Sequence, residues 1–510
     1  MFMVEKLAKR NAVTGFLLVL SLLLALANPM NPLVEWPRTL TDQSVFRTVA
    51  MVMQQGGMPY LDSFDHKGPL LFVYYYWGMN LSYNHGVWLF CWASLLITLV
   101  FMYRTARLWL ARPQSCLVTA AGTLLTLGKF YEQGGLTEDF AMPYIAMALY
   151  FFLGYFQGRK LSAGKWFLLG WAFMSVALLR VNMVVPFLFF PPLIWLKEIW
   201  AGKGRLLIKP VLAFAAGLSL LGAFVAYWLW QGNALTACLA DYIQFNLAYS
   251  ADPERASLKN KIMSLVYFAK QPAILLSLVV LADRCLLTVK KWYSFDCMYV
   301  LYIILALLAI CISGQQYGHY GMVLIPCTVY PLVLLLKGAA ATISRQRLRV
   351  WLGLLMASMA LMAVMPLTKQ LYGYFKTGYN LRDVRADKDC ANLLNEIVRR
   401  TDEQDRISVF GNDNIIYVAS NRLPASVYSY QFPIANVDNR IGEKYFADLH
   451  NNRPKIIVVV RQKATAPIFS RWSKKMVDFL QTECYNEVYS NDKYIIYEQQ
   501  GSGETDGRGI

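Results

Sequence analysis

The residues best suited to chemistry lie in a few short polar segments between long apolar runs. They are Asp42, Asp62, Asp65, His66, Lys67, Glu138, Asp139, His319 and Tyr320. An aspartate can take a proton from an acceptor hydroxyl. A lysine can offset the charge of a departing phosphate, and carboxylates can also hold a divalent cation. In one aqueous pocket, such groups would suit a transfer from a polar, phosphate-bearing headgroup.

Each of these residues also has a purely structural interpretation. Asp42 precedes apolar residues at helical spacing, so its carboxylate could simply cap a helix. Thr137 or Glu138 could cap the helix that follows them, and His319 could be a packed, hydrogen-bonded histidine. The run from Asp65 to Lys67 could be a solvated turn. No single residue separates these interpretations from catalysis.

Composition restricts the class of protein. The chain has 510 residues, of which 56% are hydrophobic and 16% charged, whereas a soluble domain usually carries about 25% charged residues. This excludes a soluble enzyme and predicts a polytopic α-helical membrane protein with about eleven spans. The predicted spans are Asn11–Ala27 (an uncleaved first helix), Gly86–Tyr103, Ser115–Leu127, Phe140–Phe156, Trp166–Leu179, Val184–Leu196, Val211–Trp230, Ile262–Leu281, Phe295–Ile312, Tyr320–Leu336 and Val350–Pro366.

The placement of basic residues predicts the orientation. With the N-terminus in the cytoplasm, Lys and Arg concentrate in every segment on that side: 1–10, 104–114, 157–165, 197–210, 283–291 and 337–349. The net charge of +17 is then explained by cationic loops facing an anionic leaflet rather than by nucleic acid. If Pro69–Tyr83 spanned the bilayer, the basic loop Arg104–Arg112 would lie outside. We therefore expect Pro69–Tyr83 to be an interfacial helix.

The last part of the chain changes character. Segment 367–500 is polar, with strand-like runs at Arg406–Phe410, Ile415–Ala419, Lys455–Val460 and Tyr494–Glu498 and with helix-like stretches between them. This pattern predicts a small extracytoplasmic α/β domain that follows a membrane domain of residues 1–366. The Gly-rich segment 501–510 is expected to be a disordered tail. This topology puts all the candidate residues on the outer face.

The joint pattern resembles the bacterial GT-C glycosyltransferases, which include protein O-mannosyltransferases and the lipid A aminoarabinose transferase. The motifs that carry the resemblance are Asp42-Gln43, Gly57-Met58-Pro59-Tyr60-Leu61-Asp62, Asp65-His66-Lys67-Gly68-Pro69, Glu138-Asp139, Gly318-His319-Tyr320 with Pro326, Val409-Phe410-Gly411-Asn412 and Pro424-Ala425-Ser426-Val427-Tyr428. The resemblance covers most of the chain and implies a GT-C-like fold.

The resemblance also implies roles. It implies a membrane transferase that moves a sugar from a polyprenyl-phosphate-linked donor to a lipid, glycan or protein acceptor, by inverting displacement, outside the bacterial inner membrane. Asp42 would be the base, with Asp139 or Glu138 shaping the acceptor or metal site. Lys67, with His66, His319 and Tyr320, would lie near the donor phosphate, and Asp62 and Asp65 would support them. Many relatives carry a second acid where this chain has Gln43, so no metal is assigned, although a divalent metal stays open.

Two other functions compete with a transferase. A transporter or flippase of lipid-linked saccharides would place ionisable groups near the bilayer midplane, where this sequence has mainly Lys270, with Arg180 near a helix end. A saccharide polymerase would usually have one large central outer loop. The sugar and the acceptor cannot be derived from the residues.

Overall fold

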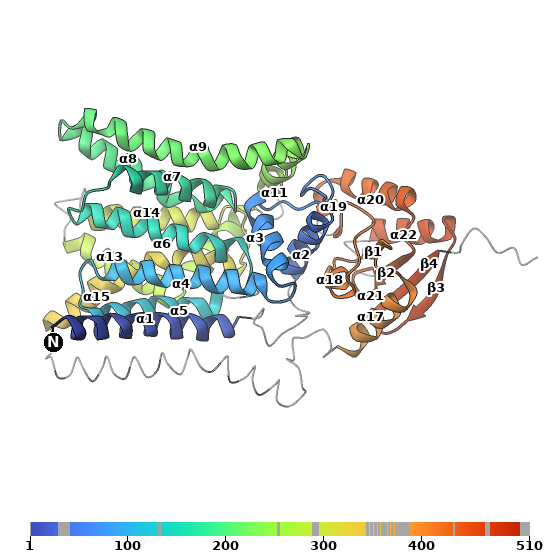
Figure 1. The fold of residues 1–510 in the computed structure, drawn as a ribbon, viewed down its shortest axis with the longest axis horizontal. Coiled ribbons are helices and arrows are strands. Elements are labelled where there is room, and N and C mark those ends of the chain that lie inside the picture. Colours follow the sequence, from blue (N-terminus) through green and yellow to red (C-terminus); the bar gives the residue numbers. More distant parts are fainter. Residues whose placement is uncertain are drawn as a thin grey trace, which may run out of the picture.

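The computed structural model describes residues 2–28, 41–130, 132, 134–251, 256–287, 295–342, 387–431, 434–464 and 470–499, with scattered single positions between 346 and 372. Two bodies are evident: a bundle of long, roughly parallel helices and a smaller α/β domain at one end of it (Figure 1). The last predicted span, Val350–Pro366, the domain boundary after residue 366 and the predicted tail at 501–510 lie outside the described residues.

Helices build the larger body because its apolar runs must satisfy their backbone groups internally within a membrane. Its elements are α1 (Phe2–Leu26), α2 (Thr41–Gln54), α3 (Pro69–Leu81), α4 (Gly86–Ala106), α5 (Arg112–Phe130), α6 (Thr137–Phe156), α7 (Ala163–Ala177), η1 (Val181–Met183), α8 (Val185–Trp200), η2 (Gly204–Leu207), α9 (Ile208–Gln231), α10 (Leu235–Cys238), η3 (Leu239–Gln244), α11 (Phe245–Ala251), α12 (Leu258–Ala269), α13 (Pro272–Leu287), α14 (Phe295–Ile310), η5 (Gly318–Leu324), η6 (Pro326–Thr328) and α15 (Val329–Thr342).

The number of membrane crossings is not established by helix length. Within the described residues, three helices are long and apolar enough to span a bilayer: Gly86–Ala106, Thr137–Phe156 and Gly204–Gln231. Counting each of two bent pairs as one span brings the number to five, and Asn11–Leu26 and Phe295–Ile310 are shorter apolar helices. The polytopic helical character is therefore clear, whereas eleven spans remain a prediction.

The predicted continuous span Ile262–Leu281 is wrong in detail. The chain breaks at Lys270 and Gln271, just before Pro272, and α12 and α13 meet there at 86°. Proline lacks a backbone N–H and clashes with the preceding turn, which explains the break. Lys270, the most conspicuous charge inside the predicted spans, is consequently the residue that ends α12.

Helix α3 matches the predicted segment Pro69–Tyr83 and is not among the candidate spans. Several of its aromatic residues pack inside the protein, although the segment was expected to be an interfacial helix. Tyr74 stacks on Phe140 with ring centroids 4.5 Å apart, and the buried Tyr75 hydroxyl donates to the Gly135 carbonyl at 2.8 Å. Only Trp77 is widely exposed, at 60%. Helix α3 is thus wedged against the α6 end of the bundle.

The smaller body is an α/β domain around one four-stranded sheet. Its order is β1-β2-β4-β3, with β1 parallel to β2 and the other neighbours antiparallel. Its elements are α17 (Lys388–Arg400), β1 (Ile407–Phe410), α18 (Ile415–Ser420), α19 (Ile434–Val437), α20 (Asn439–Asn452), β2 (Ile456–Val460), α21 (Arg461–Ala464), α22 (Ser470–Thr482), β3 (Tyr485–Ser490) and β4 (Tyr494–Gln499). The sheet confirms the small C-terminal domain.

The sequence prediction failed at one strand and missed another. Ile415–Ala419 was expected to be a strand but lies in the helix α18. A short, wholly apolar run fits a buried strand or a buried helix equally well, and these residues are buried on nearly all sides. Strand β3 was not predicted because its outward positions are polar and exposed.

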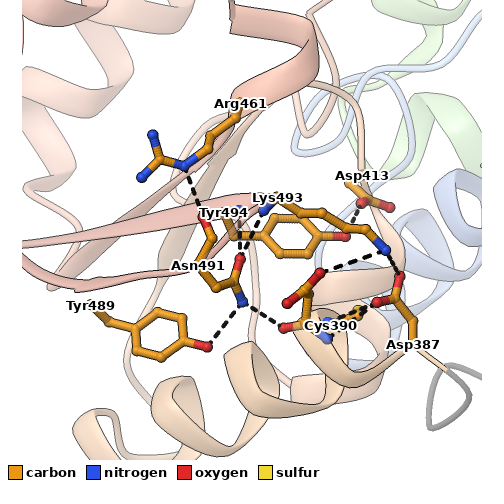
Figure 2. A network of polar contacts seen from close by, with 9 residues as sticks. Asp387, Cys390, Asp413, Arg461, Tyr489, Asn491, Lys493 and Tyr494 are labelled. Atoms are coloured by element: carbon orange, nitrogen blue, oxygen red, sulfur yellow. Dashed lines mark hydrogen bonds and ion pairs between the residues drawn. The ribbon is translucent and has the colours of Figure 1, made fainter.

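A polar network fixes the β3–β4 turn to the rest of the domain (Figure 2). The Asn491 side chain accepts hydrogen bonds from the Lys493 and Tyr494 backbone N–H groups and donates to the Asp389 carbonyl at 2.9 Å. Lys493 pairs with the Asp387 carboxylate at 2.7 Å, and that carboxylate caps α17. The network ties the β-hairpin to α17.

The two bodies are in direct contact. Helix α18 packs against α2, and the Tyr83 hydroxyl donates to the Val418 carbonyl at 2.9 Å. The backbone N–H of Phe64 donates to the Val427 carbonyl at 2.9 Å, and the Phe64 ring lies 6.1 Å from that of Tyr430. The α/β domain therefore rests directly on the loop between α2 and α3, which contains several of the candidate residues.

Candidate active site

The loop between α2 and α3 is folded by its own side chains. Tyr60 adopts a positive φ of 70°, which is unusual for a bulky residue. Its hydroxyl donates to the Lys67 carbonyl at 2.7 Å, and its N–H donates to the Ser63 carbonyl at 2.8 Å. The exposed Asp62 accepts from the Met58 N–H at 2.7 Å. Asp62 thus stabilises a turn within the loop.

Backbone contacts hold the end of this loop against the segment that follows α7. The Gly68 N–H donates to the Leu179 carbonyl at 3.2 Å, and the Leu70 N–H donates to the Leu178 carbonyl at 3.1 Å. A Cβ at Gly68 would lie 2.0 Å from the Leu178 carbonyl oxygen, so only glycine allows this approach. The contact brings Lys67 close to Arg180.

Lys67 and His66 form a pair at the end of the loop. The Lys67 Nζ lies 2.7 Å from His66 Nε2. Burial, together with the charges of Lys67 and Arg180, keeps the pKa of His66 well below its usual value, so the imidazole is neutral. Because an ammonium can only donate, Nε2 accepts and Nδ1 carries the proton. That Nδ1 is buried and has no hydrogen-bond partner among the described residues.

Arg180 is the second cation of the site, and sequence analysis gave it no catalytic role. Its guanidinium donates to Glu138 Oε1 at 2.5 Å and lies 3.7 Å from the centroid of the Tyr320 ring. The Thr137 hydroxyl donates to the other oxygen of Glu138 at 2.8 Å. Glu138 is thus held in a buried ion pair that joins α6, the segment after α7 and η5.

Asp139 has a different environment from Glu138. Its Oδ2 accepts from the Leu136 N–H at 2.9 Å, three residues earlier, which satisfies a free donor at the start of α6. The side chain is 2% exposed. A cap was the structural alternative weighed for this segment, with Thr137 or Glu138 as the capping residue. The structure assigns the capping contact to Asp139.

His319 is paired with an acid that the sequence analysis did not name. Its Nδ1 donates to Glu132 at 2.8 Å, and the Gly318 N–H donates to the same carboxylate at 2.7 Å. Burial alone would raise the pKa of Glu132, but these hydrogen bonds lower it below its usual value. The His319 ring lies 4.8 Å from Tyr320. His319 therefore lies at the edge of the group formed by Arg180, Glu138 and Tyr320, and among the described residues it makes no contact with Lys67.

Asp65 and Asp42 bring negative charge to the same region. Asp65 is buried, and its Oδ1 accepts from the Lys67 N–H at 2.8 Å. Burial raises the pKa of Asp65 to about 6, and the charge of Asp42 adds to the increase while Lys67 opposes it. Asp42 is half-buried in the first turn of α2 and also interacts electrostatically with Tyr320. The two carboxylates thus flank the cations.

A third carboxylate, Asp241, lies on η3, a segment of π-helix, which is often found at functional sites. Burial raises the pKa of Asp241 to about 7, and the charge of Asp65 adds to the effect. Burial also raises the pKa of Tyr430 from the α/β domain, and the charges of Asp65, Asp42 and Asp241 raise it further. Tyr430 therefore lies among three carboxylates that come from three separate segments.

The described residues contain no group of three or more His, Cys, Asp or Glu side chains arranged to hold a metal ion.

The arrangement brings together Asp42, Asp65, His66, Lys67, Glu138 and Tyr320 at the end of the bundle that faces the α/β domain, while Asp62, Asp139 and His319 support its edges. Arg180, Glu132, Asp241 and Tyr430 were missed. Glu132 had a usable signal, since it lies in the same short outer loop as Glu138. Asp241 had none, because its surroundings in the sequence do not predict a π-helix.

Comparison with solved structures identifies the class of fold. The crystal structure of ArnT from Cupriavidus metallidurans bound to undecaprenyl phosphate superposes with a TM-score of 0.63 at 14% identity, covering 96% of this chain and 98% of ArnT. Its apo form gives 0.61 with the same identity and coverage. An Archaeoglobus fulgidus oligosaccharyltransferase is more distant, with a TM-score of 0.45 at 13% identity over 96% of this chain and 73% of that chain. The GT-C fold predicted from the loop motifs is confirmed.

The family follows from the sequence. Residues 5–350 match the family described as putative competence-induced protein Ccs4 N-terminal domain, and the chain belongs to it. No curated protein matches the chain.

The buried carboxylate of Asp65 yields a prediction about stability. Its pKa is about 6 in the folded protein against about 3.9 in an unfolded chain, so the native state binds the proton more tightly. Stability is therefore lost as pH rises from about 4 to 6. Asp65→Asn keeps an acceptor for the Lys67 N–H and removes this cost. It should raise the thermal midpoint at pH 8, by the equivalent of about 1–3 kcal/mol, with a gain that shrinks towards pH 4.

Asp62→Asn is the matched control, because Asp62 accepts a backbone hydrogen bond in the same loop but is exposed. Thermal unfolding of the purified protein in detergent between pH 4 and 8 measures both variants. An Asp65→Asn gain that is constant with pH, or a loss at pH 8, would contradict a buried, ionised Asp65.

Proposed function

We propose that this protein is a membrane glycosyltransferase that moves a sugar from a polyprenyl-phosphate-linked donor to an acceptor outside the cytoplasmic membrane. The observation that carries the proposal is the juxtaposition of Lys67 and Arg180 with carboxylates on the loop, α2 and η3, under the α/β domain. The fold supports it, since the similar ArnT structure holds undecaprenyl phosphate. The transferred group would be a hexosyl or pentosyl residue.

The two cations suit the donor phosphate. Arg180 is already fixed by Glu138 and by the Tyr320 ring, so its remaining donors are preorganised. Lys67 is only half-buried, and its ammonium donates to neutral His66 rather than to a carboxylate. Its full positive charge therefore remains available to a phosphate. The role of His66 is then to orient Lys67. His319 and Tyr320 act less directly, by positioning Glu138 and Arg180.

Asp42 is the proposed general base. It is half-buried, whereas Asp139 is 2% exposed and occupied by the Leu136 N–H. One general base, with no residue assigned as a separate nucleophile, fits direct displacement with inversion at the sugar carbon. Glu138 holds Arg180, and Asp65 and Asp62 shape the loop that presents Lys67.

The domain assignment and orientation belong to the same proposal. Residues 1–366 would form the catalytic membrane domain, and residues 367–500 an extracytoplasmic domain that contributes Tyr430 to the acceptor side. The N-terminus would be cytoplasmic in a bacterial inner membrane crossed about eleven times. The positive-inside distribution of Lys and Arg supports this orientation.

Substitution of Asp42 separates catalysis from helix capping. Asn caps helices about as well as Asp but cannot take a proton from a hydroxyl, so Asp42→Asn should fold normally and lose roughly 10²–10⁴-fold in turnover. The measurement is sugar transfer from a defined lipid-linked donor by purified protein. Asp139→Asn, which keeps an acceptor for the Leu136 N–H, is the comparison and should lose far less. Near-normal turnover of Asp42→Asn would transfer the base role to Asp139.

Substitution of Lys67 tests the donor phosphate. Lys67→Ala removes a cation, so it should raise the donor concentration needed for half-maximal rate by roughly tenfold or more. Lys67→Arg should recover only part of this loss, because the guanidinium has a different shape. Lys474→Ala removes an exposed cation far along the chain and should change nothing. If Lys67→Ala transfers sugar normally at every donor concentration, Lys67 does not contact the phosphate.

A native thiol tests the orientation. Cys484 of the α/β domain is exposed, whereas the other eight cysteines are buried or half-buried. A membrane-impermeant maleimide should label it in cells whose outer barriers, but not the cytoplasmic membrane, are permeable, and Cys484→Ser should abolish that labelling. Labelling that requires lysis would place the domain in the cytoplasm.

A further inference from the structure

A cavity of about 620 Å³ lies between α1, α4 and the start of α5, away from the candidate active site. Its walls are apolar and come from both long helices, with Leu17 on α1 and Leu96 and Val100 on α4 among them. Cavities of roughly 300–1,000 Å³ accommodate small organic molecules. This one is large enough for a lipid headgroup with the adjoining part of its acyl chains.

One end of the cavity is strongly basic. Arg104, Arg107 and Arg112 line it together with Tyr103, and none of the described residues that line it is acidic. Arg104 and Arg107 are exposed and Arg112 is half-buried. Guanidinium groups bind phosphate through paired hydrogen bonds, and tyrosine rings concentrate at membrane interfaces. The lining therefore changes from apolar to basic along its length, which complements the acyl chains and the phosphate of a phospholipid.

The cavity lies at the opposite membrane surface from the donor site. Helix α4 begins beside the loop that meets the α/β domain and ends at Ala106, and its 21 residues cover about 30 Å, the thickness of the hydrocarbon core. The N-terminus of α1 also lies at the end of the bundle away from the α/β domain (Figure 1). This end is the proposed cytoplasmic one, where anionic lipids collect.

We propose that this cavity binds one acidic glycerophospholipid of the cytoplasmic leaflet, with its phosphate against the three arginines and its chains along α1 and α4. The site does not depend on the transfer reaction. It also does not hold the sugar donor, because the candidate catalytic groups lie at the other surface. A bound lipid would join α1 to α4, which also packs against α3 and α6.

Native mass spectrometry of the full chain in detergent tests the proposal with phosphatidylglycerol and phosphatidylethanolamine offered at equal concentration. The wild-type protein should retain one phosphatidylglycerol in preference to phosphatidylethanolamine. The triple variant Arg104→Gln/Arg107→Gln/Arg112→Gln should lower that retention by at least about tenfold. The matched control, Lys203→Gln/Arg205→Gln/Lys209→Gln, removes three exposed cations from another predicted cytoplasmic segment and should leave retention unchanged.

Val100→Phe keeps every charge and fills the apolar wall, so it should also reduce retention, even if the arginine variant fails to fold. A photoreactive phosphatidylglycerol should crosslink to peptides of α1 and α4 in the wild-type protein. Equal losses in the two triple variants, equal retention of the two lipids, crosslinks elsewhere, or displacement of the lipid by polyprenyl phosphate would each overturn the proposal.

Discussion

The buried ion pair between Arg180 and Glu138 is the interaction on which the rest of the site depends. Removing two charges from water is costly unless each finds good partners. Here Glu138 receives both Arg180 and the Thr137 hydroxyl, while the guanidinium lies on the face of Tyr320. Because these groups come from three segments far apart in the sequence, the pair fixes where the outer ends of α6, α7 and η5 meet.

The loop between α2 and α3 packs against that fixed point. Two backbone hydrogen bonds and the absence of a Cβ at Gly68 seat the loop on the segment just before Arg180, so Lys67 and Arg180 become neighbours although they repel each other. Neutral His66 and the carboxylate of Asp65 lessen this repulsion. The α/β domain then covers the loop through Phe64 and Tyr430. Two neighbouring cations, of which Arg180 is paired with Glu138 while Lys67 contacts neutral His66, suit an anionic ligand such as a lipid phosphate.

The sequence was informative where candidate residues adjoin one another along the chain, and it was less informative where their proximity depends on packing. The Asp65-His66-Lys67-Gly68 run was identifiable because four functional types adjoin one another, and Asp42 because it opens a helix-spaced pattern. Arg180 looked like an ordinary charge near a helix end, and only the folded chain brings it to Glu138 and Tyr320. Lys270 was taken for a charge in the middle of a continuous helix because the break before Pro272 was not anticipated. Ile415–Ala419 shows the same limit, since a short apolar run does not encode whether its neighbours form a sheet or a helical layer.

The central claim is that the protein transfers a sugar rather than transporting a lipid-linked sugar. An assay without a bilayer separates the two functions, because in detergent there is nothing to transport across. Purified protein in detergent would be incubated with extracted lipid-linked sugars and cell-envelope acceptors, and the lipids followed by liquid chromatography with mass spectrometry. The account predicts that a sugar-bearing polyprenyl phosphate disappears while free polyprenyl phosphate and a glycosylated acceptor accumulate together. A well-folded protein that binds the lipid-linked sugar but leaves every one of these species unchanged would contradict it.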